Sequence, residues 1–202
     1  MKPFQIAANA YLNRPVDSFY HVQYTRMGNP GNPDYLNDLK NTFNDFLISK
    51  LDSATQELRK ALEADLPEIL RSLSHATLVV CVVPRAKNER AYSRDQQLFR
   101  TTVQAVARQS HGLVDGTDYL RRHTTTRTTH LVRKFSNNAD RDPYPGITEQ
   151  TCNISADVRG KDILLVDDIY TPGVNIDEDA IQALFEAGAH SVCFYGIGRV
   201  IH

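Results

Sequence analysis

Two adjacent carboxylates, Asp167 and Asp168, stand directly after an aliphatic run and shortly before a loop. The aliphatic run, residues 163–166, is typical of a strand buried on both faces of a parallel sheet. Ligands of open α/β sheets bind at the carboxyl ends of such strands. The loop at 171–175 leads into an amphipathic segment, where a helix start favours an anion. The pattern indicates a site for a ligand that combines hydroxyl groups, or a metal, with a phosphate.

The segment from Ile163 to Asn175 resembles the signature of the phosphoribosyltransferases, which bind phosphoribosyl pyrophosphate (PRPP). The order of motifs is most similar to the competence-protein-F (ComF-like) branch. It comprises Val-Pro with basic residues and a helix, an Arg/Thr-rich strand, Val-Asp-Asp, and a helix ending in Ala-Gly-Ala. The likeness extends from about Leu78 to the C-terminus. ComF-like proteins often carry an N-terminal zinc ribbon, which this chain lacks, because its three cysteines are widely spaced.

The resemblance implies a role for each motif. Asp167 and Asp168 would hold the ribose 2′- and 3′-hydroxyls, stabilise a cationic sugar, and help to hold Mg²⁺ through water or those hydroxyls. The loop that would hold the 5′-phosphate consists of Thr171, Pro172, Gly173, Val174 and Asn175. The pyrophosphate loop and lid would comprise Arg85, Ala86, Lys87 and Arg90, with Arg94 nearby.

Two residues of the phosphate loop depart from the family pattern. Pro172 stands where the family usually has Thr, and Asn175 stands where it has Thr or Ser. Proline removes one backbone N–H and one hydroxyl. Loss of one charge-assisted hydrogen bond costs roughly 1.5–3 kcal/mol, which weakens binding by one or two orders of magnitude. The departures leave three alternatives: the phosphate is held differently, the ligand differs, or activity is reduced.

The stretch 121–130 alternates threonine with arginine and histidine. Such alternation suits a strand with one polar face. By resemblance it would line the acceptor site or contact the lid. A charged, protected sheet edge is an equal alternative, and a nucleic-acid contact is a third.

Apolar patterning predicts an α/β core over residues 76–202. Pro84 ends the first strand, and Gly188 ends the last helix. Strand and helix alternation predicts a Rossmann-like parallel twisted sheet, which the resemblance narrows to the type I phosphoribosyltransferase kind. The predicted elements are a strand at 77–83, a helix at 94–108, a β-like run at 121–135, a loop at 136–150, a strand at 163–166, a helix from Asp177 or Glu178, and a strand at 191–197.

Residues 1–75 are predicted to form an N-terminal helical cap or hood packed on this core. A short strand at 19–24 and a turn-rich loop at 28–33 precede a helical pattern. The helix would begin after Asp34 and continue to Leu66, with Phe43 and Leu47 on its apolar stripe. Pro67 would either open another helical turn or break the helix.

Composition limits the class of protein. The chain has 202 residues, 41% apolar and 23% charged, with a formal net charge of −1, so nucleic acid is not an expected partner. No apolar run is long enough to cross a membrane, and no secretory signal is recognised, so a cytoplasmic location is expected. A homodimer is compatible with the resemblance. The histidines show no metal-binding spacing, and no general base is identified.

These observations give a first hypothesis of a Mg²⁺-dependent phosphoribosyltransferase. It would transfer ribose 5-phosphate from PRPP to an unidentified nitrogenous base or amine and release pyrophosphate. The alternative is a catalytically weak or inactive module of the same fold that binds PRPP or a nucleotide as a sensor or effector. A weaker third hypothesis is hydrolysis of a nucleotide N-glycosidic bond.

Overall fold

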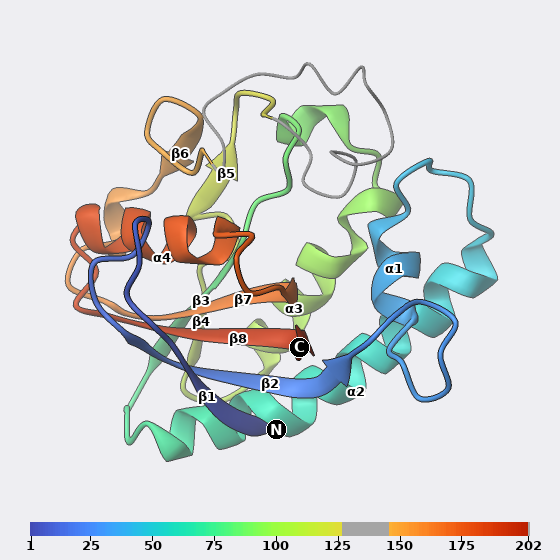
Figure 1. Ribbon diagram of the computed structural model, residues 1–202, viewed down its shortest axis with the longest axis horizontal. Helices are drawn as coiled ribbons and strands as arrows, with labels where there is room; N and C mark the ends of the chain where they lie inside the picture. The colour runs from blue at the N-terminus through green and yellow to red at the C-terminus, as the bar shows by residue number, and fades with distance from the viewer. Residues whose placement is uncertain (127–145, 202) are drawn as a thin grey trace.

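A six-stranded mixed sheet forms the centre of the computed structural model, which describes residues 1–126 and 146–201 (Figure 1). The strand order is β1-β2-β8-β7-β3-β4, and every neighbouring pair is parallel except the antiparallel edge pair β1 and β2. The strands are β1 (Lys2–Ile6), β2 (Val16–Tyr24), β3 (Leu78–Val82), β4 (Leu113–Asp115), β7 (Asp162–Tyr170) and β8 (Ser191–Val200). The predicted α/β class with a mostly parallel sheet is therefore confirmed.

The two predicted central strands, β3 and β7, lie side by side at the middle of the sheet. All of β3 is buried, and residues 163–166 of β7 are inaccessible to solvent, because helices cover both faces. Strand β7 is longer than predicted: it continues through Asp167 and Asp168 to Tyr170. It does so because β8 continues to pair with it, up to the Tyr170–Arg199 pair. The two carboxylates thus lie within the strand, beyond the last residue that pairs with β3, Val166.

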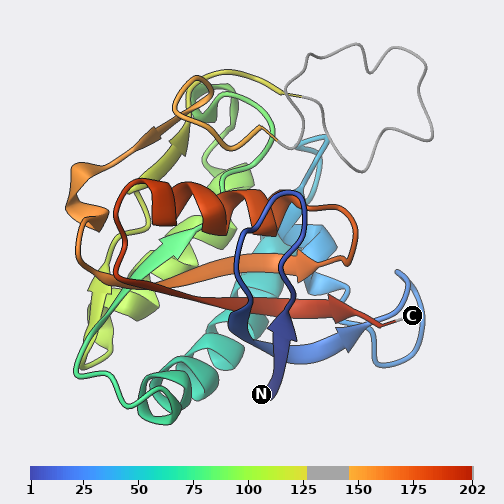
Figure 2. The same ribbon diagram turned by 60° about the vertical axis from the view of Figure 1, so that its left-hand side comes forward.

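Helices cover the two faces of the sheet unequally. Helices α1, α2 and α3 pack on one face, and α4 packs on the other (Figures 1 and 2). Each face has its own apolar core, one built around α2 and α3 and the other around α4. The α-helices are α1 (Tyr35–Lys40), α2 (Ile48–Ser72), α3 (Leu98–Gln109) and α4 (Ile176–Glu186), with short 3₁₀ helices η1 (Glu89–Ala91), η2 (Asp95–Gln97) and η4 (Ala156–Val158).

The N-terminal third differs from the predicted helical cap. Strands β1 and β2 belong to the main sheet, so residues 1–75 contain both strands and helices. The single long helix is also wrong, because α1 ends at Lys40 and Asn41 adopts the left-handed region with φ 37°. The Asn41 side chain accepts hydrogen bonds from two following backbone N–H groups, which ends the helix. As a result Phe43 and Leu47 are 77% and 75% exposed, whereas α2 continues unbroken through Pro67.

A separate antiparallel pair lies apart from the main sheet, above α4 in the view of Figure 1. It consists of β5 (Leu120–Arg122) and β6 (Cys152–Ile154). The predicted β-like run is confirmed as a strand only at Arg121 and Arg122, and residues 123–126 do not belong to a strand. Its remainder at 127–135, like most of the predicted loop at 136–150, lies outside the described residues. In the described part of the chain, no helix combines the length and apolarity that a membrane crossing requires.

Candidate functional site

The candidate site lies at the carboxyl ends of β3 and β7. The chain leaves β3 for α3 and β4 on one side, and it leaves β7 for α4 and β8 on the other. The order of strands therefore reverses between β3 and β7, which is the position where open α/β sheets bind ligands. A pocket lies at this point. Its charged lining side chains are Lys40, Arg85, Lys87, Arg100 and Arg122, with Glu89, Asp167 and Asp168.

The pocket brings together some of the predicted site residues and leaves others outside. Arg85, Lys87, Asp167 and Asp168 line it, although they come from segments about 80 residues apart. Ala86, Arg90 and the loop 171–175 do not line it, and Arg90 is exposed. Arg85 and Lys87 of the predicted pyrophosphate loop therefore share one cavity with the acidic pair, whereas no residue of the predicted phosphate loop lines it.

The two adjacent carboxylates face opposite sides of the sheet. Asp168 forms an ion pair with the Lys40 ammonium of α1 at 3.2 Å, and both side chains are about one-fifth exposed. Asp167 instead meets Asp177 in the first turn of α4, with which it shares a hydrogen bond. Their neighbour Tyr170 also packs on the α4 side. The carboxylates thus connect the pocket to both helical layers.

Asp167 sits in an environment that opposes its negative charge. Loss of hydration, followed by the charge of Asp168, raises the pKa of Asp167 to about 7. The same two causes, burial and the facing Asp167 carboxylate, raise the pKa of Asp177 well above its ordinary value. A proton is therefore retained between these two carboxyls near neutral pH. Asp177 Oδ1 is buried without a hydrogen-bond partner.

The first turn of α4 carries three consecutive acidic residues. Besides Asp177, Glu178 accepts a hydrogen bond from the Tyr170 hydroxyl at 3.0 Å. Asp179 accepts one from the Ile147 backbone N–H at 2.6 Å. These carboxyls use the favourable helix N-terminus themselves, so they compete with any phosphate placed there.

The loop at 171–175 forms a turn in which two residues, Gly173 and Asn175, have a left-handed backbone conformation. Gly173 has φ 80° and Asn175, the residue before α4, has φ 65°. The Asn175 amide donates to the Gly173 carbonyl oxygen, and Asn9 of the β1–β2 connection donates to the Asn175 side-chain oxygen, each at 3.2 Å. A Cβ atom at Gly173 would meet nothing within 4 Å, so the outer side of this turn is open.

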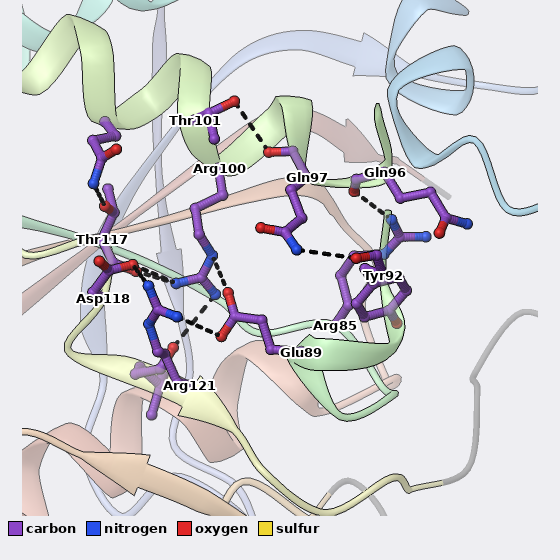
Figure 3. A network of polar contacts seen from close by, with 12 residues as sticks. Arg85, Glu89, Tyr92, Gln96, Gln97, Arg100, Thr101, Thr117, Asp118 and Arg121 are labelled. Atoms are coloured by element: carbon purple, nitrogen blue, oxygen red, sulfur yellow. Dashed lines mark hydrogen bonds and ion pairs between the residues drawn. The ribbon is translucent and has the colours of Figure 1, made fainter. Parts of the chain in front are cut away.

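Arg85 holds two parts of the pocket wall together. Its guanidinium donates to the Gln96 carbonyl oxygen at 2.7 Å and to the Lys40 carbonyl oxygen at 2.8 Å. The group also lies over the Tyr92 ring at 4.3 Å. Figure 3 shows Arg85 among Tyr92, Gln96 and Gln97. Arg85 thus fixes the end of α1 against the segment that precedes α3, and two of its donor groups are already used.

A second arginine, Arg100 of α3, is the centre of an ion-pair network on the same wall (Figure 3). Its Nε lies 3.2 Å from Glu89 Oε1, and both side chains are largely buried. Arg100 and Arg121 both reach Asp118, and Arg121 also approaches Glu89 at 3.7 Å. Burial lowers the pKa of Arg100, and the Glu89 carboxylate opposes that effect. The network joins η1, α3 and β5.

Arg122 of β5 is almost completely buried, with 2% of its surface exposed. Its Nε donates to the Arg85 carbonyl oxygen at 2.8 Å, and its Nη1 donates to the Gly146 carbonyl oxygen at 2.9 Å. Its Nη2 is buried without a hydrogen-bond partner. Burial lowers the pKa of Arg122, against the attraction of Cys152, Tyr92 and Asp179.

Several pocket residues were not singled out from the sequence. Lys40, Glu89 and Arg100 give no local signal, since each is an ordinary charged residue in a helical or loop segment. Arg122 belongs to the Arg/Thr-rich stretch, whose composition did indicate a special segment without identifying this residue. The described residues contain no group of three histidine, cysteine or acidic side chains that could hold a metal. A Mg²⁺ ion held by the described residues would need further oxygen ligands from a bound diphosphate or from water.

No model of a known protein family matches the sequence, and no curated protein matches it either. The fold and the site define the class instead. The chain is an α/β protein with a mixed, mostly parallel sheet, compatible with a Rossmann-like fold. A pocket lined by charged side chains lies at the switch point of the sheet.

Proposed function

We propose that this chain binds PRPP and transfers its ribose 5-phosphate to a nitrogenous acceptor, with release of pyrophosphate. The observation that carries the proposal is the position of Asp167 and Asp168 in a pocket at the switch point of the sheet. The same pocket holds the basic segment that follows β3. A sugar with two hydroxyls and a diphosphate needs both kinds of group within a few ångströms. The proposal includes the type I phosphoribosyltransferase fold as the particular form of this α/β architecture.

In the proposed reaction the C1–O bond to the diphosphate breaks, and its electron pair leaves with pyrophosphate. Positive charge develops on the ribosyl ring, the acceptor nitrogen forms a bond to C1 with its lone pair, and the acceptor nitrogen then loses a proton to water. Asp168 would accept a hydrogen bond from a ribose hydroxyl, and Lys40, which now pairs with Asp168, would then move towards a ligand oxygen. The carboxylates stabilise the cationic sugar electrostatically. Mg²⁺, when bound with the diphosphate, would neutralise part of its charge.

The proposal is tested by following PRPP consumption and pyrophosphate release by the purified protein with Mg²⁺ and a panel of purine and pyrimidine bases, amines and ammonia. We expect pyrophosphate to appear with at least one acceptor, and release to fall when Asp168 is replaced by Asn. Absence of pyrophosphate release with every acceptor would contradict a transferase function.

A second candidate function is binding of PRPP or a nucleotide without turnover. The acidic first turn of α4 favours it, because three carboxyls occupy the helix N-terminus that a 5′-phosphate would use. Pro172, which has no N–H, removes a further donor from the same loop. Under this alternative PRPP at about 100 times its Kd stabilises the protein by about 2.7 kcal/mol while no acceptor is converted. A thermal shift combined with the turnover assay separates the two functions.

A further inference from the structure

The cations that line the pocket differ in what they contact. Lys40 is paired with Asp168, and Arg100 is paired with Glu89. Arg85 donates hydrogen bonds from two of its nitrogens to backbone carbonyl oxygens, and its guanidinium lies over the Tyr92 ring. These three side chains therefore already form ion pairs or hydrogen bonds with other groups of the protein.

Arg122 differs from them in one respect. It is 98% buried, yet among the described residues no carboxylate forms an ion pair with it, and its Nη2 has no hydrogen-bond partner. The guanidinium of an arginine keeps its proton in proteins, so Arg122 carries its positive charge into the buried site. Asp179 attracts this guanidinium, but among the described residues no carboxylate lies within ion-pair distance of it. A buried cation without a close anion is costly, and a ligand anion that completes the pair removes that cost.

The orientation of Arg122 is also fixed before any ligand arrives. Hydrogen bonds from Nε to the Arg85 carbonyl oxygen and from Nη1 to the Gly146 carbonyl oxygen hold two of its nitrogens. The guanidinium therefore loses little freedom when its remaining donors are used. Lys87, an exposed cation on the same pocket wall, can approach the same anion.

We infer that Arg122, rather than Arg85, is the guanidinium that binds an oxyanion of the ligand in this pocket. The inference rests on the proposed function in that it takes the ligand to be phosphorylated. The chemical class is a phosphoryl oxygen pair, carried by the diphosphate of the sugar donor or by a phosphorylated acceptor. Arg85 is then a positioning residue, which holds the wall in which Arg122 is anchored through the Arg85 carbonyl oxygen.

The test measures the affinity for sodium pyrophosphate and for inorganic phosphate by calorimetry at low temperature and constant ionic strength. The variants are Arg122→Met, Arg122→Lys and Arg85→Lys. Arg108→Met is the matched control, because Arg108 forms an ion pair with Asp115 at 2.7 Å outside the pocket. We expect Arg122→Met to weaken pyrophosphate binding by about tenfold or more, and Arg122→Lys to weaken it less. Arg85→Lys should weaken it less than Arg122→Lys, and Arg108→Met should leave it unchanged.

Two further readouts separate binding from a structural role. Melting temperature reports any loss of the carbonyl contacts, and the salt dependence of pyrophosphate affinity reports the binding charge. A structural role would lower the melting temperature of Arg122→Met but leave the affinity and its salt dependence unchanged. Such a result, or a larger loss in Arg85→Lys, would overturn the inference.

The two proposals fail in distinguishable ways. PRPP binding that needs Asp168 but not Arg122 would leave the proposed function in place and remove this assignment. Pyrophosphate binding that needs Arg122, without any PRPP binding, would do the reverse. If inorganic phosphate binds as tightly as pyrophosphate, the oxyanion belongs to a phosphorylated acceptor; preference for pyrophosphate assigns it to the sugar donor.

Discussion

The two sides of the pocket differ in how their charged side chains are paired. On the wall built by η1, α3 and β5, Arg100, Glu89, Arg121 and Asp118 neutralise one another in a network of ion pairs. On the β7 wall, Asp167 meets Asp177 of α4, which lies behind the pocket lining, and one of these two carboxyls keeps a proton near neutral pH. The first arrangement stabilises a fold, whereas the second costs stability. Unfavourable electrostatics of the second kind cluster at functional sites, which supports the proposal that the chemistry takes place on the β7 side.

The largest effect is expected on the neutralised wall. Arg100→Met removes the central cation and leaves the largely buried Glu89, among the described residues, with only the more distant Arg121. Because breaking a buried ion pair leaves an uncompensated charge, the free energy of unfolding should fall by about 3–5 kcal/mol. Urea unfolding measures it.

The matched control for that variant is Arg59→Met. Arg59 pairs with Glu63 at 3.2 Å on the surface of α2, so its loss should change stability by about 0–1 kcal/mol. Equal losses in the two variants would show that the Arg100 network contributes no more than a surface pair.

An intermediate effect is expected on the acidic wall, with the opposite sign. The pKa of Asp167 is raised in the folded state to about 7, so folding favours its protonated form. The stability of the wild type should therefore decline as pH rises from about 4 towards 7, and it should stay low above that range. Asp177→Asn removes the facing charge and can still donate to Asp167. We expect it to be as stable as the wild type at pH 4 and about 1–2 kcal/mol more stable at pH 8.

Chemical denaturation at several pH values measures this difference. A constant difference between Asp177→Asn and the wild type across the pH range would contradict the account, because it would mean that the two carboxyls do not influence each other.

The smallest effect concerns the loop 171–175, which connects β7 to α4. Pro172→Thr restores a backbone N–H and a hydroxyl, so PRPP should bind about tenfold more tightly, equivalent to about 1.4 kcal/mol. Pro172→Ala restores the N–H alone and should give a smaller gain. Titration calorimetry measures both. Unchanged affinity in both variants would mean that this loop does not contact the phosphate.

The sequence predicted the parts of the fold whose signal is local. Strands β3 and β7 were found because residues buried on both faces are apolar without interruption. Strand β1 was missed, because an exposed edge strand that contains Pro3 has no such run. The break after Lys40 was missed because the hydrogen bonds of Asn41 end the helix, whereas the apolar spacing continues beyond it.

The sequence predicted only those parts of the candidate site whose residues are close together in the chain. Asp167 and Asp168 are adjacent in the chain and carry a recognisable context. Lys40, Arg100 and Arg122 reach the pocket from three distant segments, so only the tertiary structure brings them together. The meeting of Asp167 with Asp177 also depends on the packing of α4 against β7, which no spacing rule predicts.

The most direct test of the central claim is titration calorimetry of the wild type with PRPP and Mg²⁺, repeated on the double variant Asp167→Asn/Asp168→Asn. The variant is suited to this use, because replacing carboxylates that repel each other should not unfold the protein; circular dichroism verifies this. The account predicts saturable binding by the wild type and its loss in the variant. Absence of binding by the wild type, or equal binding by the variant, would contradict a sugar-phosphate site at the end of β7.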